Sequence, residues 1–205
     1  MIKKIAIIGF GSHSSSSINL LMKHFSFTNM AFYDDSFKKG AQESINSIHL
    51  IGHSRDIEIN QDVFLSIGDN NLREKYFLEF KNQVIKKSLF HSNSVQEKDS
   101  IFGIANQVFA QTYINSKTII GDNNIVNSGA IIEHDCQIGS HNHISIGSKL
   151  CGRVSIGNKC FIGAGSIILN KLSVCDNVII GAGAVVIRDI SKPGTYVGNP
   201  AKKIK

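Results

Sequence analysis

The sequence predicts two folded parts, a small parallel α/β domain followed by a solenoid of short β-strands. The second part is predicted by apolar residues at every sixth position, without interruption, from Phe102 to Val186. The first part is predicted by apolar runs that alternate with helical patterns before residue 92. Since a period of six fits neither a helix nor a plain strand, it indicates a repeated unit of strand and turn.

Glycines indicate how the repeats close into a coil. Gly often follows the apolar position, and several of these glycines lie eighteen residues apart: Gly103, Gly121, Gly139 and Gly157, then Gly163 and Gly181. Eighteen residues are three repeats, which predicts a coil of three short strands, with Gly at corners that need positive φ or close backbone approach. Five coils between residues 102 and 191 would form a rod about 24 Å long at the usual strand spacing.

Small and β-branched residues usually stand two positions before the apolar one, where they would fit beside the inward side chain of a narrow prism. They are Thr112, Thr118, Ala130, Cys136, Ser148, Val154, Cys160, Ser166, Val178 and Ala184. The four cysteines of the chain all lie in the repeat and form no CxxC pair. Neither a zinc site nor a disulfide framework is therefore predicted, and a reducing cytoplasm is the expected location.

The first part has the pattern of a Rossmann-like domain, in which parallel strands alternate with helices. Strands are expected at 4–10, 30–33 and 63–67, and helices over 14–25 and 72–80. A polar or Gly-rich turn follows each strand, and a ligand would bind at these carboxyl ends. The domains are expected to span 1–92 and 93–205.

Several classes of protein are not predicted. The N-terminal apolar run is too short for a secretory signal, and no stretch approaches the roughly eighteen apolar residues of a membrane span. The net charge of +6 would favour phosphate-bearing ligands such as coenzyme A or nucleotide sugars, although ordinary surface lysines explain it equally well. No basic stripe is interleaved with aromatic residues, so nucleic-acid binding is not expected.

The phase of the repeat sorts the histidines of the second part. His134, His141 and His143 lie within ten residues of one another. Ile132 and Ile138 are apolar positions that point inward, so His134, the third residue of its repeat, should face outward.

The neighbours of His134 suit a general base. Glu133 and Asp135 supply carboxylates that can fix an imidazole tautomer and increase its basicity. Gly152, eighteen residues later, would leave space above His134 for a substrate atom. Two alternatives are a surface histidine without a role and a metal ligand. The metal site is disfavoured because no histidine has another one eighteen residues away, so no metal is expected.

The turn from Gly9 to Ser14 is a weak dinucleotide-binding fingerprint, because Ser14 replaces the third glycine. Asp34 lies about where a ribose-binding acid would fall. The turn could still hold phosphates through backbone N–H groups at a helix N-terminus, or it could be a plain strand-to-helix connection.

Together these residues resemble the sialic acid O-acetyltransferase-like branch of the hexapeptide-repeat acyltransferases, in particular the UDP-4-amino-sugar N-acetyltransferases of bacillosamine biosynthesis. The resemblance covers nearly the whole chain. Its motifs are Gly11–His13, Tyr33–Asp35, Ile67–Asn70 with Arg73, Ser128–Gly139, His143–Ser145 and Gly198–Lys202. It implies a left-handed parallel β-helix, acetyl-CoA as cosubstrate, a nucleotide-sugar substrate and a homotrimer.

The resemblance also implies roles for single residues. His134 matches the proton acceptor of the family, Asp135 matches the acid that increases its basicity, and Asn127 matches a residue close to the sugar amine. Residues that match acetyl-CoA contacts are His143, Ala164 and Ala182. Residues that match UDP-sugar contacts are Gly11, Ser12, His13, Asp34, Asp35 and Gly68.

The expected activity is transfer of an acetyl group to the 4-amine of a nucleotide-linked 4-amino-4,6-dideoxy sugar. Three alternatives remain open at this stage. The same base could O-acetylate sialic acid or a related sugar, or the chain could be a non-catalytic nucleotide-sugar sensor. An NAD-dependent enzyme is disfavoured by Ser14 and by the lack of a hydride-transfer domain.

Overall fold

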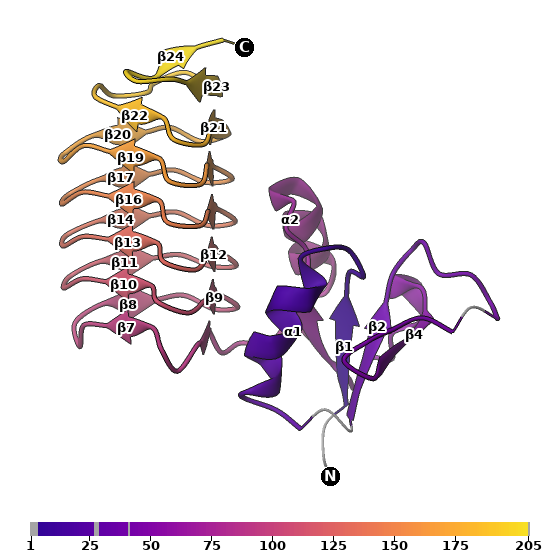
Figure 1. Ribbon diagram of the computed structural model, residues 1–205. Helices are drawn as coiled ribbons and strands as arrows, with labels where there is room; N and C mark the ends of the chain where they lie inside the picture. Colours follow the sequence, from indigo (N-terminus) through magenta and orange to yellow (C-terminus); the bar gives the residue numbers. More distant parts are fainter. Residues whose placement is uncertain (1–3, 27–28, 41, 205) are drawn as a thin grey trace. The chain divides into compact units, whose positions relative to one another are not determined.

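The computed structural model describes residues 4–26, 29–40 and 42–204. Its internal contacts divide the chain into two compact units, Met1–Leu89 and Phe90–Lys205 (Figure 1). The first unit is an α/β domain and the second is a solenoid, as the two sequence patterns predict.

The first unit is built on a five-stranded sheet with the order β3-β4-β2-β1-β5. Parallel pairing joins β1 (Ile5–Ile8), β2 (Met30–Tyr33), β4 (Ile48–Gly52) and β5 (Asp62–Leu65), whereas β3 (Ser44–Ile45) is antiparallel to β4. Two helices, α1 (Ser14–Met22) and α2 (Asn70–Glu79), follow β1 and β5, and a short 3-10 turn, η2 (Ser54–Asp56), follows β4. The β1 residues are buried, because this strand lies between β2 and β5.

The first unit differs from the sequence prediction in three places. Helix α1 ends at Met22 rather than at Phe25, because Lys23 and His24 donate their N–H groups to carbonyls three residues back in tighter turns. Helix α2 begins at Asn70, two residues earlier than expected, since the Asp69 side chain caps it by accepting from the Leu72 N–H. Strands β3 and β4 were not predicted.

The solenoid consists of two-residue strands joined by short corners. Its strands are β6 (Leu89–Phe90), β7 (Val95–Gln96), β8 (Ile101–Phe102), β9 (Gln107–Val108), β10 (Tyr113–Ile114), β11 (Ile119–Ile120), β12 (Ile125–Val126), β13 (Ile131–Ile132), β14 (Gln137–Ile138), β15 (His143–Ile144), β16 (Lys149–Leu150), β17 (Ser155–Ile156), β18 (Phe161–Ile162), β19 (Ile167–Ile168), β20 (Ser173–Val174), β21 (Val178–Ile180), β22 (Val185–Val186), β23 (Gly194–Val197) and β24 (Lys202–Lys203). All pair in parallel with strands of neighbouring coils except β24, which closes the C-terminal end antiparallel to β23.

These strands form three faces of a prism. The first face contains β7, β10, β13, β16, β19 and β22; the second contains β8, β11, β14, β17 and β20; the third contains the remaining strands. From β7 to β22, paired residues are eighteen apart, as Ile131 and Lys149 are, so each coil has three strands. The last parallel pair, β21 with β23, has a spacing of sixteen. Among the described residues, β7 to β21 make five complete coils, beginning seven residues before the first expected position.

The apolar ladder fills the interior. Every sixth residue from Val108 to Val186 is buried, and Phe102 is partly buried against this core. The small residues two positions earlier are buried as well, as predicted. The same inward phase also holds Asn106, Asn124 and Asn142, which are fully buried. Their side chains bond from coil to coil: Asn124 donates its backbone N–H to the Asn106 Oδ1 over 2.8 Å, and Asn142 does the same to Asn124.

The corners follow the same period of six. Positive φ recurs at every sixth residue from Ala105 to Gly183, with values between 55° and 68°. Of the two reasons expected for Gly103, Gly121 and their equivalents, positive φ or close backbone approach, the second is confirmed. A Cβ at Gly139 would lie 2.6 Å from the carbonyl oxygen of Gly157, and these glycines do not have positive φ.

Candidate active site

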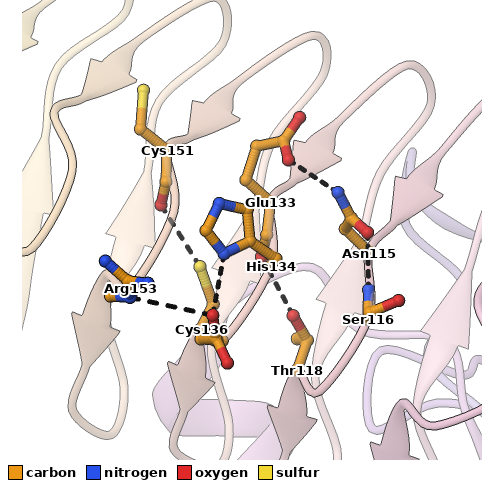
Figure 2. A network of polar contacts seen from close by, with 9 residues as sticks. Asn115, Ser116, Thr118, Glu133, His134, Cys136, Cys151 and Arg153 are labelled. Carbon is orange, nitrogen blue, oxygen red and sulfur yellow. Dashed lines mark hydrogen bonds and ion pairs between the residues drawn. The ribbon is translucent and has the colours of Figure 1, made fainter.

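His134 lies on the corner where the chain passes from β13 on the first face to β14 on the second (Figure 2). We call this corner, with its equivalents at 115–118, 151–154 and 169–172, the His134 corner. The prediction that His134 faces outward is confirmed, because its side chain is 48% exposed. Its Nδ1 lies 2.8 Å from the Oδ2 of Asp135.

Asp135 meets His134 because of its backbone conformation. Its φ of 59° belongs to the left-handed region, which is found at this step of every corner and which Asp adopts more readily than most residues. The pKa of Asp135 lies below its usual range, mainly because of the hydrogen bond with His134 and, more weakly, because of Arg153 and Lys117. As a carboxylate, Asp135 can only accept, so it assigns the hydrogen to Nδ1 and leaves a lone pair on Nε2.

Two further expectations at this corner are corrected. Glu133 does not reach His134; its Oε2 accepts a hydrogen bond of 2.7 Å from Asn115, in the coil below. The room left by Gly152 is occupied by the imidazole itself, since a Cβ on Gly152 would lie 2.7 Å from the Nε2 of His134. The absence of a side chain at Gly152 therefore allows the imidazole of His134 to occupy this position.

The thiol nearest this site is held away from nucleophilic chemistry. Cys136 is buried and donates a hydrogen bond to the carbonyl of Cys151 over 3.3 Å (Figure 2). Burial raises the pKa of the Cys136 thiol to about 11, so it is protonated at neutral pH. The exposed imidazole is thus the group at this corner suited to accept a proton.

Asn127 and His143 contact each other at a different place. Asn127 follows β12, on the corner from the third face to the first, and His143 is the first residue of β15. The Oδ1 of Asn127 accepts from the Ser128 N–H, so its Nδ2 faces the Nε2 of His143 at 3.3 Å. His143 is then an acceptor at Nε2, and its ring packs edge-on against Phe161.

Ala164 and Ala182 lie on the same corner as Asn127, which we call the Asn127 corner; it comprises 127–130, 145–148, 163–166 and 181–184. Gly147, Gly165 and Gly183 have positive φ there, and nothing would contact a Cβ on any of them. Within one chain, His134 thus lies on one corner and Asn127, Ala164 and Ala182 lie on another, with the first face between the two corners. His143 contacts Asn127 from β15 on the third face.

In the first unit, the predicted substrate residues gather at the carboxyl ends of β1, β2 and β5. Gly11, Ser12 and His13 form the turn between β1 and α1. Gly68 lies beside His13, since a Cβ added to Gly68 would stand 3.6 Å from the Cβ of His13. Asp34 ties this turn to β2, since its Oδ2 accepts a hydrogen bond of 2.8 Å from the Phe10 N–H.

Asp35 points elsewhere. One carboxylate oxygen accepts from the Ser54 hydroxyl and the other accepts from the Tyr76 hydroxyl over 2.7 Å. These two hydrogen bonds lower the pKa of Asp35, with the Tyr76 bond as the largest cause. Neither Ser54 nor Tyr76 belongs to a recognisable motif, so no sequence pattern predicts this network.

Arg73 supports the turn after β5 from inside the domain. Its side chain is fully buried and donates to the carbonyls of Ile67 and Gly68 and to the Asn70 Oδ1. Burial lowers the pKa of Arg73 to about 9. The guanidinium thus holds the loop in which Gly68 lies.

Two absences complete the description of the candidate site. Among the residues that the structure describes, no three His, Cys, Asp or Glu side chains are grouped so that they could hold a metal ion. Within the same ranges, neither helix has the length and apolar character required to cross a membrane.

Sequence comparison identifies both parts of the chain. Residues 4–80 match the family described as PglD N-terminal domain, and residues 135–170 and 153–188 match bacterial transferase hexapeptide repeats. No curated protein sequence matched the chain.

Solved structures resemble the whole chain. The acetyltransferase domain of PglB from Neisseria gonorrhoeae has a TM-score of 0.88 and 28% identity, and the match covers 98% of this chain and 100% of that one. PerB from Caulobacter crescentus, in complex with CoA and GDP-perosamine, has a TM-score of 0.89 and 28% identity, covering 100% of this chain and 99% of that one. The PglB domain has also been solved with acetyl coenzyme A, with a TM-score of 0.86.

These matches extend over both units and agree with the architecture described above. The predicted fold class, a Rossmann-like parallel-sheet α/β domain followed by a left-handed parallel β-helix of hexapeptide repeats, is confirmed. The chain therefore joins a part that matches the PglD N-terminal domain family to a part that matches bacterial transferase hexapeptide repeats, and over both parts it is similar to the PglB acetyltransferase domain and to PerB.

Proposed function

We propose that this protein is an acetyl-CoA-dependent N-acetyltransferase that acts on the 4-amine of a nucleotide-linked 4-amino-4,6-dideoxy sugar in bacterial glycan synthesis. The observation that carries the proposal is the exposed His134–Asp135 pair. The relatives support the substrate class, since PerB was solved with CoA and GDP-perosamine and the PglB domain with acetyl coenzyme A. UDP is the predicted nucleotide of this chain.

His134 is the proposed general base. The sugar amine attacks the carbonyl carbon of the acetyl-CoA thioester, a C–N bond forms, and the C–S bond breaks. The amine proton passes to the Nε2 of His134 and then to the departing sulfur, while Asp135 holds Nδ1–H and stabilises the imidazolium. Backbone N–H groups of the coil would stabilise the oxyanion. Base catalysis of this kind contributes about 10² to 10⁴ in rate.

The proposed ligand contacts divide between the two units. Gly11, Ser12, His13, Asp34 and Gly68 would hold the nucleotide sugar at the carboxyl ends of the strands, and Asp35 would support them through Ser54 and Tyr76. Asn127 would lie near the amine. His143, Ala164 and Ala182 would contact acetyl-CoA, the alanines through their backbone.

The proposed assembly is a homotrimer. His134 and Asn127 lie on different corners, and a neighbouring copy would bring the His134 corner of one chain to the Asn127 corner of the next. The outward residues of the intervening first face are mostly apolar, which suits packing between copies: Val95, Tyr113, Ile131, Ile167 and Val185. Light scattering coupled to size exclusion should give three times the chain mass, and a monomer would contradict the assembly.

The proposed location is the cytoplasm. The four cysteines are free thiols, which fits a reducing compartment.

The test of the reaction is an acetyl-transfer assay with purified protein. UDP- and GDP-linked 4-amino sugars are compared with free sialic acid, and thiol release is measured with mass spectrometry of the product. We expect N-acetylation of a nucleotide-linked amino sugar and at least a 10²-fold loss of turnover in His134→Ala, with acetyl-CoA binding retained. Turnover unchanged in His134→Ala would exclude the proposed base. Acetylation of sialic acid alone would favour O-acetyl transfer, and no thiol release with any sugar would favour a sensor.

A further inference from the structure

Arg153 lies directly above the His134–Asp135 pair. It stands eighteen residues after Asp135 and occupies the same step of the next coil, also with positive φ. Its Nε is 3.7 Å from the Asp135 Oδ2, the same oxygen that lies 2.8 Å from the Nδ1 of His134 (Figure 2). One carboxylate oxygen therefore faces two positively charged or potentially charged groups.

The backbone keeps Arg153 in this register. Its N–H donates a hydrogen bond of 2.9 Å to the carbonyl oxygen of His134, as part of the coil-to-coil pattern at the corner. This hydrogen bond holds the Arg153 backbone in place next to Asp135, although the Arg153 side chain is 58% exposed.

The other ionisable groups around His134 are few. Lys117 occupies the equivalent step in the coil below and also lowers the pKa of Asp135. Glu133 accepts a hydrogen bond from Asn115. Cys136 is buried, and burial raises the pKa of its thiol. Cys151 is the remaining ionisable side chain at this level of the corner. Asp135 is therefore the one acid in contact with the imidazole among the described residues, and Arg153 is the cation on the same oxygen.

Two opposing effects act on His134 in this arrangement. The negative charge of Asp135 favours the imidazolium, whereas a guanidinium beside the same oxygen offsets part of that charge. We infer that Arg153 is a positioning residue that shares the Asp135 Oδ2 with His134 and offsets part of the carboxylate charge that the imidazole faces. The inference rests on the proposed function of His134 as a base, and a limited proton affinity would help the imidazolium to return its proton to the departing sulfur.

The experiment measures His134 directly. The imidazole titration is followed by NMR in the full-length protein without substrate, and the His134 signal is assigned from its absence in His134→Gln. Arg153→Gln should move the midpoint to higher pH by about 0.5 unit, the order expected when one charge near the imidazole is removed in a solvated setting. The shift should shrink in high salt. The acid limb of the kcat/KM profile should move in the same direction.

Matched variants separate this effect from loss of structure. Lys171→Gln removes a cation from the same step of the following coil, also at positive φ, and should leave the midpoint within about 0.1 unit because the charge is more distant. Arg153→Lys should restore the wild-type midpoint. An unchanged or lower midpoint in Arg153→Gln, or an equal shift in Lys171→Gln, overturns the inference. Because the titration needs no substrate, absence of acetyl transfer would count against the proposed function and leave this result standing.

Discussion

The imidazole of His134 lies so close to Gly152 that a single methyl group there could not be accommodated without displacing the ring. An added Cβ would stand 2.7 Å from Nε2 and 2.8 Å from Cε1. The two residues are eighteen apart, so Gly152, which has no side chain, occupies the position in the next coil that is equivalent to that of His134, the proposed base. The placement of the His134 imidazole therefore depends on the absence of a side chain at Gly152.

Gly152→Ala tests this dependence. The new methyl group should push the imidazole off its place while leaving the coil intact, because the φ of Gly152 does not require glycine. We expect turnover to fall about 10²-fold, since displacement of a catalytic group by about 1 Å has effects of this order. The measurement is acetyl transfer at saturating substrates, with circular dichroism to check the fold.

The control is the double variant with His134→Ala. If the methyl group acts through the imidazole, adding Gly152→Ala to His134→Ala should cost almost nothing further. Wild-type turnover in Gly152→Ala, or an additive loss in the double variant, would contradict this account.

Asp135→Asn isolates the charge of the carboxylate. Asn tolerates positive φ as well as Asp does, so the corner should keep its shape, but the amide can no longer stabilise an imidazolium. We expect turnover to fall tenfold or more with a melting temperature close to that of the wild type. Asp135→Ala should lose about 1 kcal/mol of stability in addition, because Ala resists the left-handed region. Full activity in Asp135→Asn would remove Asp135 from the mechanism.

Arg73→Met should destabilise the first unit. The substitution keeps most of the apolar stem but removes the donor to a buried acceptor on Ile67 and to partly buried acceptors on Gly68 and Asn70. We expect a loss of about 2–4 kcal/mol in urea unfolding and weaker binding of the nucleotide sugar, because Gly68 lies in the affected loop. Arg73→Lys should lose less, since one charge remains. Equal stability of wild type and Arg73→Met would show that the guanidinium does not hold the loop.

Tyr76→Phe should change how stability depends on pH. The folded-state pKa of Asp35 lies below its usual value of 3.8, first because of the Tyr76 hydroxyl. A carboxyl group of this kind stabilises the fold above its unfolded pKa, and the contribution is lost as pH falls through the folded value. Without the hydroxyl, stability at pH 7 should drop by about 1 kcal/mol. The decline between pH 5 and pH 3 should become shallower, and an unchanged slope in chemical unfolding would argue against this linkage.

Asn124→Ala should weaken the solenoid from inside. Asn124 bonds to Asn106 below and accepts from Asn142 above, and all three side chains are buried. The substitution removes the acceptor of the Asn142 N–H and the Nδ2 donor to the Asn106 Oδ1, whereas the backbone N–H of residue 124 still donates to Asn106. The expected cost is about 2–4 kcal/mol. Asn170→Ala, on an exposed corner, is the matched control and should change stability by less than about 0.5 kcal/mol. Similar losses of stability in both variants would show that the coil-to-coil hydrogen bonds of Asn106, Asn124 and Asn142 do not stabilise the solenoid.

The period of six was enough to predict the solenoid, because one inward side chain per strand is the physical requirement of a narrow prism. It also predicted that His134 faces outward. It did not reveal the inward asparagines, because Asn106 and Asn124 stand two positions before an apolar residue, where small or β-branched residues are usual. Their burial is favourable only because they bond from coil to coil. Nor did it distinguish Gly139, which allows close approach, from Gly147, which adopts positive φ.

The first unit was less predictable for a related reason. The apolar runs located β1, β2 and β5, but β4 alternates between buried and exposed residues and lies near the sheet edge, where the sequence signal is weak. Likewise, the polar contacts of Asp35 with Ser54 and Tyr76 join residues far apart in sequence. Spacing rules detect local patterns and do not find such partners.

Because each coil has eighteen residues, the position of a residue along the solenoid axis can change without a change in the face or corner on which it lies. Duplicating one coil after residue 153 would carry every later residue about 4.8 Å further along the axis while each kept its face and corner. An insertion of six would instead rotate all later residues to the next face and separate the His134 corner from the coils above it. The solenoid can therefore be lengthened in whole coils after residue 153 without any change to the corner that carries His134.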